Sequence, residues 1–236
     1  MKKIFLLYIL VFFSYNCIFA DMFEDFLRIN NGYFQADKVY FAKQKLETYK
    51  NDEKISALKS YSIYSKDNQF VNIFEANKET FFLSTDKGYY ISSPSLRSPL
   101  KVSGSYQVDE IAIQDILRFD FLSDFEVIND DKNEILMARK NKKNPYAFAK
   151  LSKEQKDFIL ILQDAKKNDI KKIVYRPGII NSIEMFTKII IYNQAIDTLN
   201  YKCYVTETIE TLQVPVSLFT PENMKNLADY GNKYFK

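Results

Sequence analysis

The feature that most constrains the fold of this chain is a long series of short apolar segments separated by turn residues. In residues 54–64 apolar side chains alternate with serines, which is the two-residue period of a half-buried strand. Turn-forming runs such as Asp86-Lys87-Gly88 separate one segment from the next. The strand-like segments are residues 39–41, 54–64, 69–75, 79–84, 89–91, 125–129, 134–139, 146–151, 158–163, 170–175, 184–192 and 199–206. Because few helical segments interrupt them, the sequence predicts one mostly antiparallel sheet.

Two segments have the period of an amphipathic helix instead. In residues 22–34 the apolar side chains recur at three- and four-residue spacing, and Gly32 stands where such a helix would end. Residues 107–119 show the same spacing, and Asp109 and Glu110 suit the positive end of the helix dipole. The sequence therefore predicts an α+β fold with two helices beside the sheet.

Several predicted strands are apolar at consecutive positions, notably residues 70–74 and 158–162. A soluble antiparallel sheet with one face in water would alternate between apolar and polar side chains. We therefore expect both faces of these strands to meet apolar surroundings. Ordinary core packing explains this pattern, and so does a hydrophobic interior that binds a ligand.

The N-terminus has the organisation of a secretory signal peptide. Lys2 and Lys3 precede an apolar run at residues 4–13, and this run is shorter than the roughly 20 residues that a membrane-spanning helix needs. A small residue, Ala20, follows at the position of a cleavage site. We expect cleavage after Ala20, which would leave residues 21–236 as a single soluble domain in the periplasm. The sequence shows no linker, repeat or low-complexity tract that would divide it.

Cys17 permits a second interpretation, in which a lipoprotein signal peptidase cuts before a lipidated cysteine. Tyr15 is bulky for such a cleavage site, and the apolar residues 18 and 19 are unlike the polar tether of a surface lipoprotein. The sequence favours the soluble form, with membrane anchoring through Cys17 as the alternative.

The composition excludes several function classes. The chain contains no histidine, so it has no Ser–His–Asp triad, no Cys–His pair and no His-ligated metal. Its formal net charge is +3, of which Lys2 and Lys3 supply two, so the mature chain would be nearly neutral and nucleic acid is not expected as a partner. Cys203 would be its single cysteine, which rules out an internal disulfide. We expect no enzyme: no catalytic residue, no metal and no cofactor.

The short motifs of the chain do not indicate catalysis. Residues 56–59 match S-x-x-K, but the S-D-N and K-T-G partners of that chemistry are absent, and the serine lies in a strand pattern. The paired acids at 109–110 and 130–131 fall at helix-start and turn positions, where solvated carboxylates are common. The basic run 139–143 fits a hairpin end in water, and contact with anionic lipid headgroups is its alternative.

Residues 71–117 resemble the outer-membrane lipoprotein-sorting proteins of the LolA type. That family has a strand ending in Phe-Leu, an aromatic strand followed by Pro, a Gly-Ser turn, a helix ending in Asp-Leu and a closing segment with Phe and Pro. The counterparts here are Phe82-Leu83, Tyr90 with Pro94, Gly104-Ser105, Asp115-Ile116 and Phe219 with Pro221. The chain departs from the family at residues 76–79, which replace the usual Pro and Gly, and has Tyr89 or Tyr90 where Trp is common.

The resemblance implies a strongly curved antiparallel sheet that forms an incomplete β-barrel, with helices as a lid over a hydrophobic cavity. It implies a periplasmic carrier, or chaperone, that binds the acyl chains of lipoproteins and transfers them toward the outer membrane without covalent chemistry. The expected partners are acylated lipoproteins, an inner-membrane release complex and an outer-membrane acceptor, and the chain is expected to be a monomer. The same fold also serves outer-membrane-anchored acceptors and envelope sensor modules that bind protein, so these alternatives and the cargo stay open.

The apolar faces of the predicted elements supply candidate residues for the cavity. Following their periods, these candidates are Phe41, Ile55, Tyr61, Ile63, Phe70, Phe74, Leu83, Tyr90, Ile111 and Ile116. A shift of one residue in strand register would exchange candidates for their neighbours on the other face. The helix at 107–119 is the candidate lid, because the Pro- and Gly-containing loop 92–104 before it would let it move as a unit.

Overall fold

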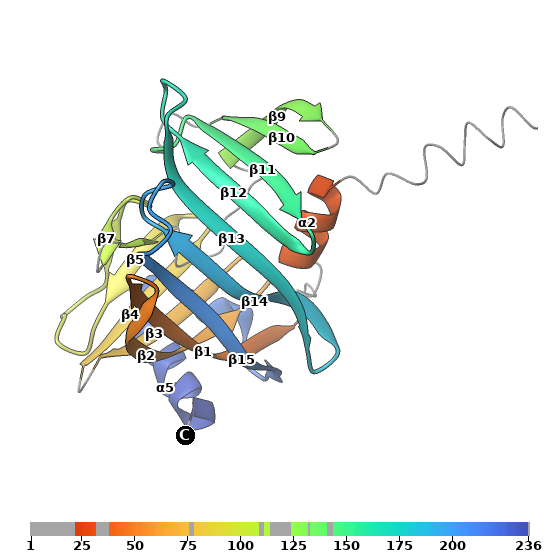
Figure 1. The fold of residues 1–236 in the computed structure, drawn as a ribbon. Helices are drawn as coiled ribbons and strands as arrows, with labels where there is room; N and C mark the ends of the chain where they lie inside the picture. Colours follow the sequence, from red (N-terminus) through yellow and green to blue (C-terminus); the bar gives the residue numbers. More distant parts are fainter. Residues whose placement is uncertain are drawn as a thin grey trace, which may run out of the picture.

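The structure is a computed structural model that describes residues 22–31, 38–75, 78–108, 111–113, 124–131, 133–140 and 144–235. Within these ranges the chain forms a 13-stranded antiparallel sheet, a separate two-stranded hairpin and two α-helices. The sheet curves strongly and stays open, because its two end strands do not pair with each other (Figure 1). No helix in the described part of the chain is long and apolar enough to cross a membrane.

The strands follow one another as a meander whose first and last members meet in the middle. In chain order the elements are α2 (Met22–Asn31), β1 (Val39–Lys50), β2 (Glu53–Tyr64), β3 (Gln69–Glu75), β4 (Lys78–Thr85), β5 (Gly88–Ser92), β6 (Leu100–Val102), β7 (Gln107–Val108), β8 (Ile111–Ala112), β9 (Phe125–Asp131), β10 (Glu134–Arg139), β11 (Phe148–Glu154), β12 (Asp157–Gln163), β13 (Asp169–Ile180), β14 (Ile183–Tyr192), β15 (Tyr201–Leu212), the 3₁₀ turns η1 (Val216–Leu218) and η2 (Pro221–Asn223), and α5 (Met224–Phe235). The order in the sheet is β6-β5-β4-β3-β2-β1-β15-β14-β13-β12-β11-β10-β9. Every neighbouring pair in this sheet is antiparallel. Strands β7 and β8 form a separate antiparallel pair outside it.

Two-residue turns with left-handed backbone set the register of the longest strand pairs. Asn51 and Asp52 have φ values of 51° and 63° between β1 and β2, and Asn181 and Ser182 have 51° and 65° between β13 and β14. Two consecutive positive φ values define a turn whose twist matches that of the flanking strands, and Asn and Asp tolerate this conformation. The turn residues therefore fix which side chains share a face.

Strand register divides the side chains of the sheet between two faces. One row of directly paired residues crosses five strands: Tyr175, Ile189, Tyr204, Leu46 and Leu58. Directly paired side chains point to the same face, and this row belongs to an apolar cluster that also includes residues from β3, β4 and β10–β12. We call the face that carries this cluster the inner face, because the sheet bends around it, and the opposite one the outer face (Figure 1).

The inner face is packed against α2. Phe26 of this helix is fully buried, with its ring centroid 5.4 Å from that of Phe158, 5.1 Å from Tyr175 and 5.0 Å from Phe186. Ile113, which follows the β7–β8 hairpin, is also fully buried in the inner cluster. Segments far apart in the sequence thus meet on this face.

The outer face is packed against the C-terminal segment over β1–β4. Figure 1 shows α5 below these strands, away from α2. Apolar side chains of α5 and of the segment that precedes it join those of the strands in a second cluster, which contains Val39, Phe41, Tyr61, Ile63, Phe70, Phe81, Leu83, Leu212, Val214, Phe219, Met224, Leu227 and Ala228. We call this set the outer cluster.

The predicted fold class is confirmed: the chain has a curved, open antiparallel sheet with helices. The helix predicted at residues 22–34 is confirmed over Met22–Asn31, and its last three residues lie outside the described ranges. The helix predicted from Gln107 is wrong at its start, because β7 and β8 pair there and the backbone N–H of Ile113 donates to the Tyr106 carbonyl (2.8 Å). Residues 114–119 of that prediction lie outside the described ranges, and the strand pattern gave no indication of α5.

Candidate functional site

Five of the ten candidate residues form one continuous row across the sheet. Phe41, Ile63, Phe70, Leu83 and Tyr90 are direct partners on β1, β2, β3, β4 and β5. The first four are completely buried and Tyr90 is half-buried. The period-2 argument therefore grouped these residues correctly, but the row lies on the outer face, against the C-terminal helix.

Tyr61 and Phe74 extend this row and fasten α5 to the sheet. The Tyr61 hydroxyl donates to the Ala228 carbonyl (2.9 Å) and lies 3.1 Å from the Asn232 side-chain oxygen. Phe74 stacks on Phe235 with ring centroids 4.8 Å apart and planes at 4°. Burial raises the pKa of the Tyr61 hydroxyl well above its ordinary value. Seven candidates therefore lie together, under a helix that is bound by directional contacts.

The remaining three candidates are not brought into this cluster. Ile55 lies near the start of β2 and is 61 % exposed. Ile111 lies in β8, where the structure describes its backbone, and Ile116 lies outside the described ranges. Contact of any of the ten with lipid stays a prediction.

The sequence neighbours of the outer row form the inner face of the same strands. Val71 and Phe82, which are direct partners on β3 and β4, are buried in the inner cluster. Ile91, the partner of Phe82 on β5, is only partly buried. Four such partly buried apolar side chains lie at this end of the inner face, namely Leu58, Tyr89, Ile91 and Val102. This end of the inner face keeps apolar surface that is accessible, away from the strands that α2 contacts.

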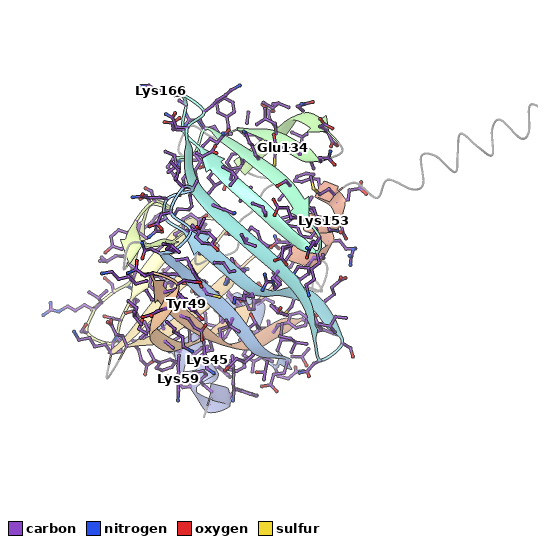
Figure 2. All side chains as sticks on the ribbon, in the orientation of Figure 1. Lys45, Tyr49, Lys59, Glu134, Lys153 and Lys166 are labelled. Carbon is purple, nitrogen blue, oxygen red and sulfur yellow. The ribbon has the colours of Figure 1, made fainter. Side chains whose placement is uncertain are left out.

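Ion pairs at the surface hold α2 against the other end of the inner face. Asp25 accepts from Lys153 of β11 (2.7 Å) and from Arg28 (2.7 Å), and Arg28 also pairs with Glu184 of β14. Figure 2 shows Lys153 beside the helix. Burial alone would raise the pKa of the Asp25 carboxyl, but the hydrogen bonds from Lys153 and Arg28 hold it below its ordinary value. The Arg28 side chain is 56 % exposed and that of Glu184 is 44 % exposed, so this pair contributes little to stability.

Two groups of described residues bear on chemical reactivity: the potential metal ligands and the thiol of Cys203. Among them, no group of three or more Cys, Asp or Glu side chains is placed to hold a metal ion. Cys203 is buried on the outer face of β15, and burial raises the pKa of its thiol to about 11, which keeps it protonated at neutral pH. The site is therefore best described as an apolar surface with a helix over part of it.

Comparison by sequence identifies no relative: no protein-family model matches the chain, and no curated protein matches it. Comparison by structure finds proteins of similar fold. A LolA superfamily protein from Nitrosomonas europaea superposes with a TM-score of 0.63 at 16 % identity, over 84 % of this chain and 96 % of that one. A domain from Vibrio parahaemolyticus that carries the name of an outer membrane lipoprotein-sorting protein gives 0.62 at 13 % identity, over 86 % of this chain and 99 % of that one.

The open, curved antiparallel sheet therefore defines the class of architecture to which the chain and these two structures belong. The fold of this chain is LolA-like, as the resemblance of residues 71–117 implied.

Proposed function

We propose that this chain is a periplasmic carrier that binds the acyl chains of lipoproteins against the inner face of its sheet and passes them toward the outer membrane. The observation that carries the proposal is the partly accessible apolar surface of Leu58, Tyr89, Ile91 and Val102. The LolA-like fold supports it, and so does the name of the Vibrio domain.

Binding and release would suffice for this function. Each CH₂ group that moves from water to an apolar surface contributes about 0.8 kcal/mol, so an acyl chain of ordinary length gains enough to leave water for the inner face. Transfer then requires that the next partner bind the chain more tightly. No side chain needs to act as a nucleophile, which agrees with the absence of histidine and the protonated state of Cys203.

The compartment and partners follow from the N-terminal sequence and the proposed cargo. Export with cleavage after Ala20 would place residues 21–236 in the periplasm as one domain and a monomer. Its partners would be acylated lipoproteins, an inner-membrane release complex and an outer-membrane acceptor.

Photo-crosslinking from adjacent residues of a strand, whose side chains point to opposite faces of the sheet, tests the proposal and locates the site. A photoreactive phenylalanine analogue at Phe82 or Ile91 probes the inner face, and the same group at Leu83 or Tyr90 probes the outer face. With an acylated lipoprotein as the probe ligand, we expect crosslinks from the inner positions. Crosslinks from the outer positions alone would place the acyl chains beneath α5 and contradict the inner-face site. No crosslink from either pair would contradict the carrier function.

Cys17 supports a second candidate function, that of an outer-membrane-anchored acceptor or an envelope protein-binding module of the same fold. The sequence feature in its favour is a cysteine just after the apolar run of the leader. Mass spectrometry of the N-terminus of the protein from its native host separates the two functions. An N-terminus at Asp21 supports the soluble carrier, whereas a diacylated Cys17 supports the anchored acceptor.

A further inference from the structure

A group of neutral polar side chains lies in the middle of the apolar inner face. Its members come from the three central strands β2, β1 and β15 and are all at most 8 % exposed: Gln44, Ser60, Ser62, Tyr64 and Thr206. Gln44 is the direct partner of Ser60 on one side and of Thr206 on the other. Ser60 is in turn the partner of Ile73, which belongs to the inner cluster, so the group points to the inner face.

Hydrogen bonds within the group use both N–H donors of the Gln44 side chain. Its side-chain nitrogen donates to the Tyr64 hydroxyl (3.0 Å) and to the Thr206 hydroxyl (3.3 Å). Its side-chain oxygen accepts from the Ser62 hydroxyl (2.5 Å). The amide is therefore held in one orientation and has no donor left for a ligand.

Ser60 differs from its neighbours, because its hydroxyl is completely buried and has no hydrogen-bond partner in the structure. A buried hydroxyl without a partner costs free energy that a neutral apolar side chain at the same position would not cost. A ligand that accepts a hydrogen bond from this hydroxyl would recover that free energy. The proposed acyl ligand would supply such an acceptor, since it occupies the same face.

We propose that the Ser60 hydroxyl donates a hydrogen bond to an ester carbonyl of the bound acyl ligand, which makes the site selective for acyl esters. This inference rests on the proposed function. The five members of the group include no charged side chain, so a carboxylate or a phosphate placed there would be buried without a counter-charge. An ester carbonyl is a neutral acceptor, which matches a single neutral donor. The site thus favours esterified chains over free fatty acids.

A pair of ligands that differ only in the carbonyls tests this inference. A pyrene-labelled diacylglycerol and its dialkyl ether analogue of equal chain length have the same apolar surface, and only the first has ester carbonyls. We expect the native chain to bind the ester about 2- to 10-fold more tightly than the ether, the range for one neutral hydrogen bond. In Ser60→Ala the ratio should fall to about one, with the affinity for the ether unchanged.

Ser56→Ala is the matched control, because Ser56 lies on the same strand and face as Ser60 but is exposed. It should keep the native ratio. Equal binding of ester and ether by the native chain would overturn the inference and leave the proposed function intact, and so would a ratio that Ser60→Ala does not change. Binding of neither ligand would instead contradict the proposed function, and the inference would fall with it. Thermal unfolding of each variant shows that the compared proteins are folded.

Discussion

The inner and outer faces of the sheet are both apolar, yet the helix that lies on each face is held in a different way: α2 lies over β11 and β14 on the inner face, and α5 lies over β2–β4 on the outer face. On the outer face, α5 is fixed by hydrogen bonds from Tyr61 and by the stacked pair Phe74 and Phe235. On the inner face, α2 buries the apolar side chains of Phe26 and Ile29, and ion pairs at the surface link it to β11 and β14. Because directional buried contacts fix α5, we expect α2 to leave its face of the sheet more readily than α5 does.

The fit between Tyr61 and α5 shows how closely the outer face is packed. A Cβ atom at Gly231 would lie 2.1 Å from a ring carbon of Tyr61, so the helix approaches the ring at a distance that only glycine allows. A ligand cannot enter here unless the whole helix moves. The inner face contrasts with this, because Leu58, Ile91 and Val102 are partly exposed while α2 is in place.

The largest expected effect comes from Phe26→Ala. Loss of a fully buried aromatic ring that contacts three others should lower the free energy of unfolding by about 3–4 kcal/mol. Because α2 loses its anchor, the inner face should also bind more of an apolar fluorescent dye. Chemical denaturation and dye titration measure the two effects. Glu24→Ala, at an exposed position of the same helix, is the control. Unchanged dye binding in Phe26→Ala would contradict the view that α2 covers part of the inner face.

Gly231→Ala should have the second largest effect, on the outer face alone. The added methyl group must displace Tyr61 or tilt α5, which should lower the free energy of unfolding by about 2 kcal/mol even though alanine has the higher helix propensity. Dye binding to the inner face should not change. Lys225→Ala, on the exposed side of α5, is the matched control. An increase in dye binding with Gly231→Ala would show that the two faces are not independent.

The sequence predicted the strands well, because the two-residue period and the turn residues act locally. The segments 69–75 and 134–139 coincide with β3 and β10, and Asn51-Asp52 forms the expected turn. The period also grouped Phe41, Ile63 and Leu83 on one face. It could not show which face bends inward, because curvature depends on contacts among strands that are far apart in the sequence.

The C-terminal helix is missing from the sequence prediction, and it packs on the face that carries most of the candidate residues. Its signals are present: Pro221 begins the turn before it, and Met224, Leu227, Ala228 and Gly231 follow at helical spacing and are all buried. A prediction that included α5 would have explained why both faces of these strands are apolar, because each face would then have its own packing partner. The β7–β8 hairpin was a harder case, since Val108, Ile111 and Ala112 fit a helical period as well as they fit a two-stranded turn.

A smaller effect is expected from the ion pairs of α2. Arg28→Ala should lower the free energy of unfolding by only about 0.5 kcal/mol, because the side chains of Arg28 and Glu184 are both largely exposed.

Asp25 adds a pH dependence to the stability, since its pKa lies below the ordinary 3.8 in the folded chain. Its stabilisation is therefore complete at neutral pH and is lost as the pH falls below about 4. Between pH 7 and pH 3, binding of the apolar dye to the inner face should increase only below about pH 4. In Asp25→Asn this increase at acid pH should be absent.

The smallest effect is expected at Cys203. This residue also provides the strictest control on the comparison between the inner and outer faces. This thiol is buried between β1 and β14 on the outer face, away from α5, and burial raises its pKa to about 11. At pH 8 its thiolate is scarce and shielded, so alkylation by iodoacetamide should be slow until the sheet itself opens. If α2 and α5 move while the sheet stays intact, neither Phe26→Ala nor Gly231→Ala should change the alkylation rate of Cys203 by more than about twofold. Peptide mass spectrometry measures this rate under conditions where each variant is folded. Faster alkylation in Phe26→Ala alone would mean that the inner helix holds the strands together, and the picture of α2 as an element that leaves an intact sheet would be wrong.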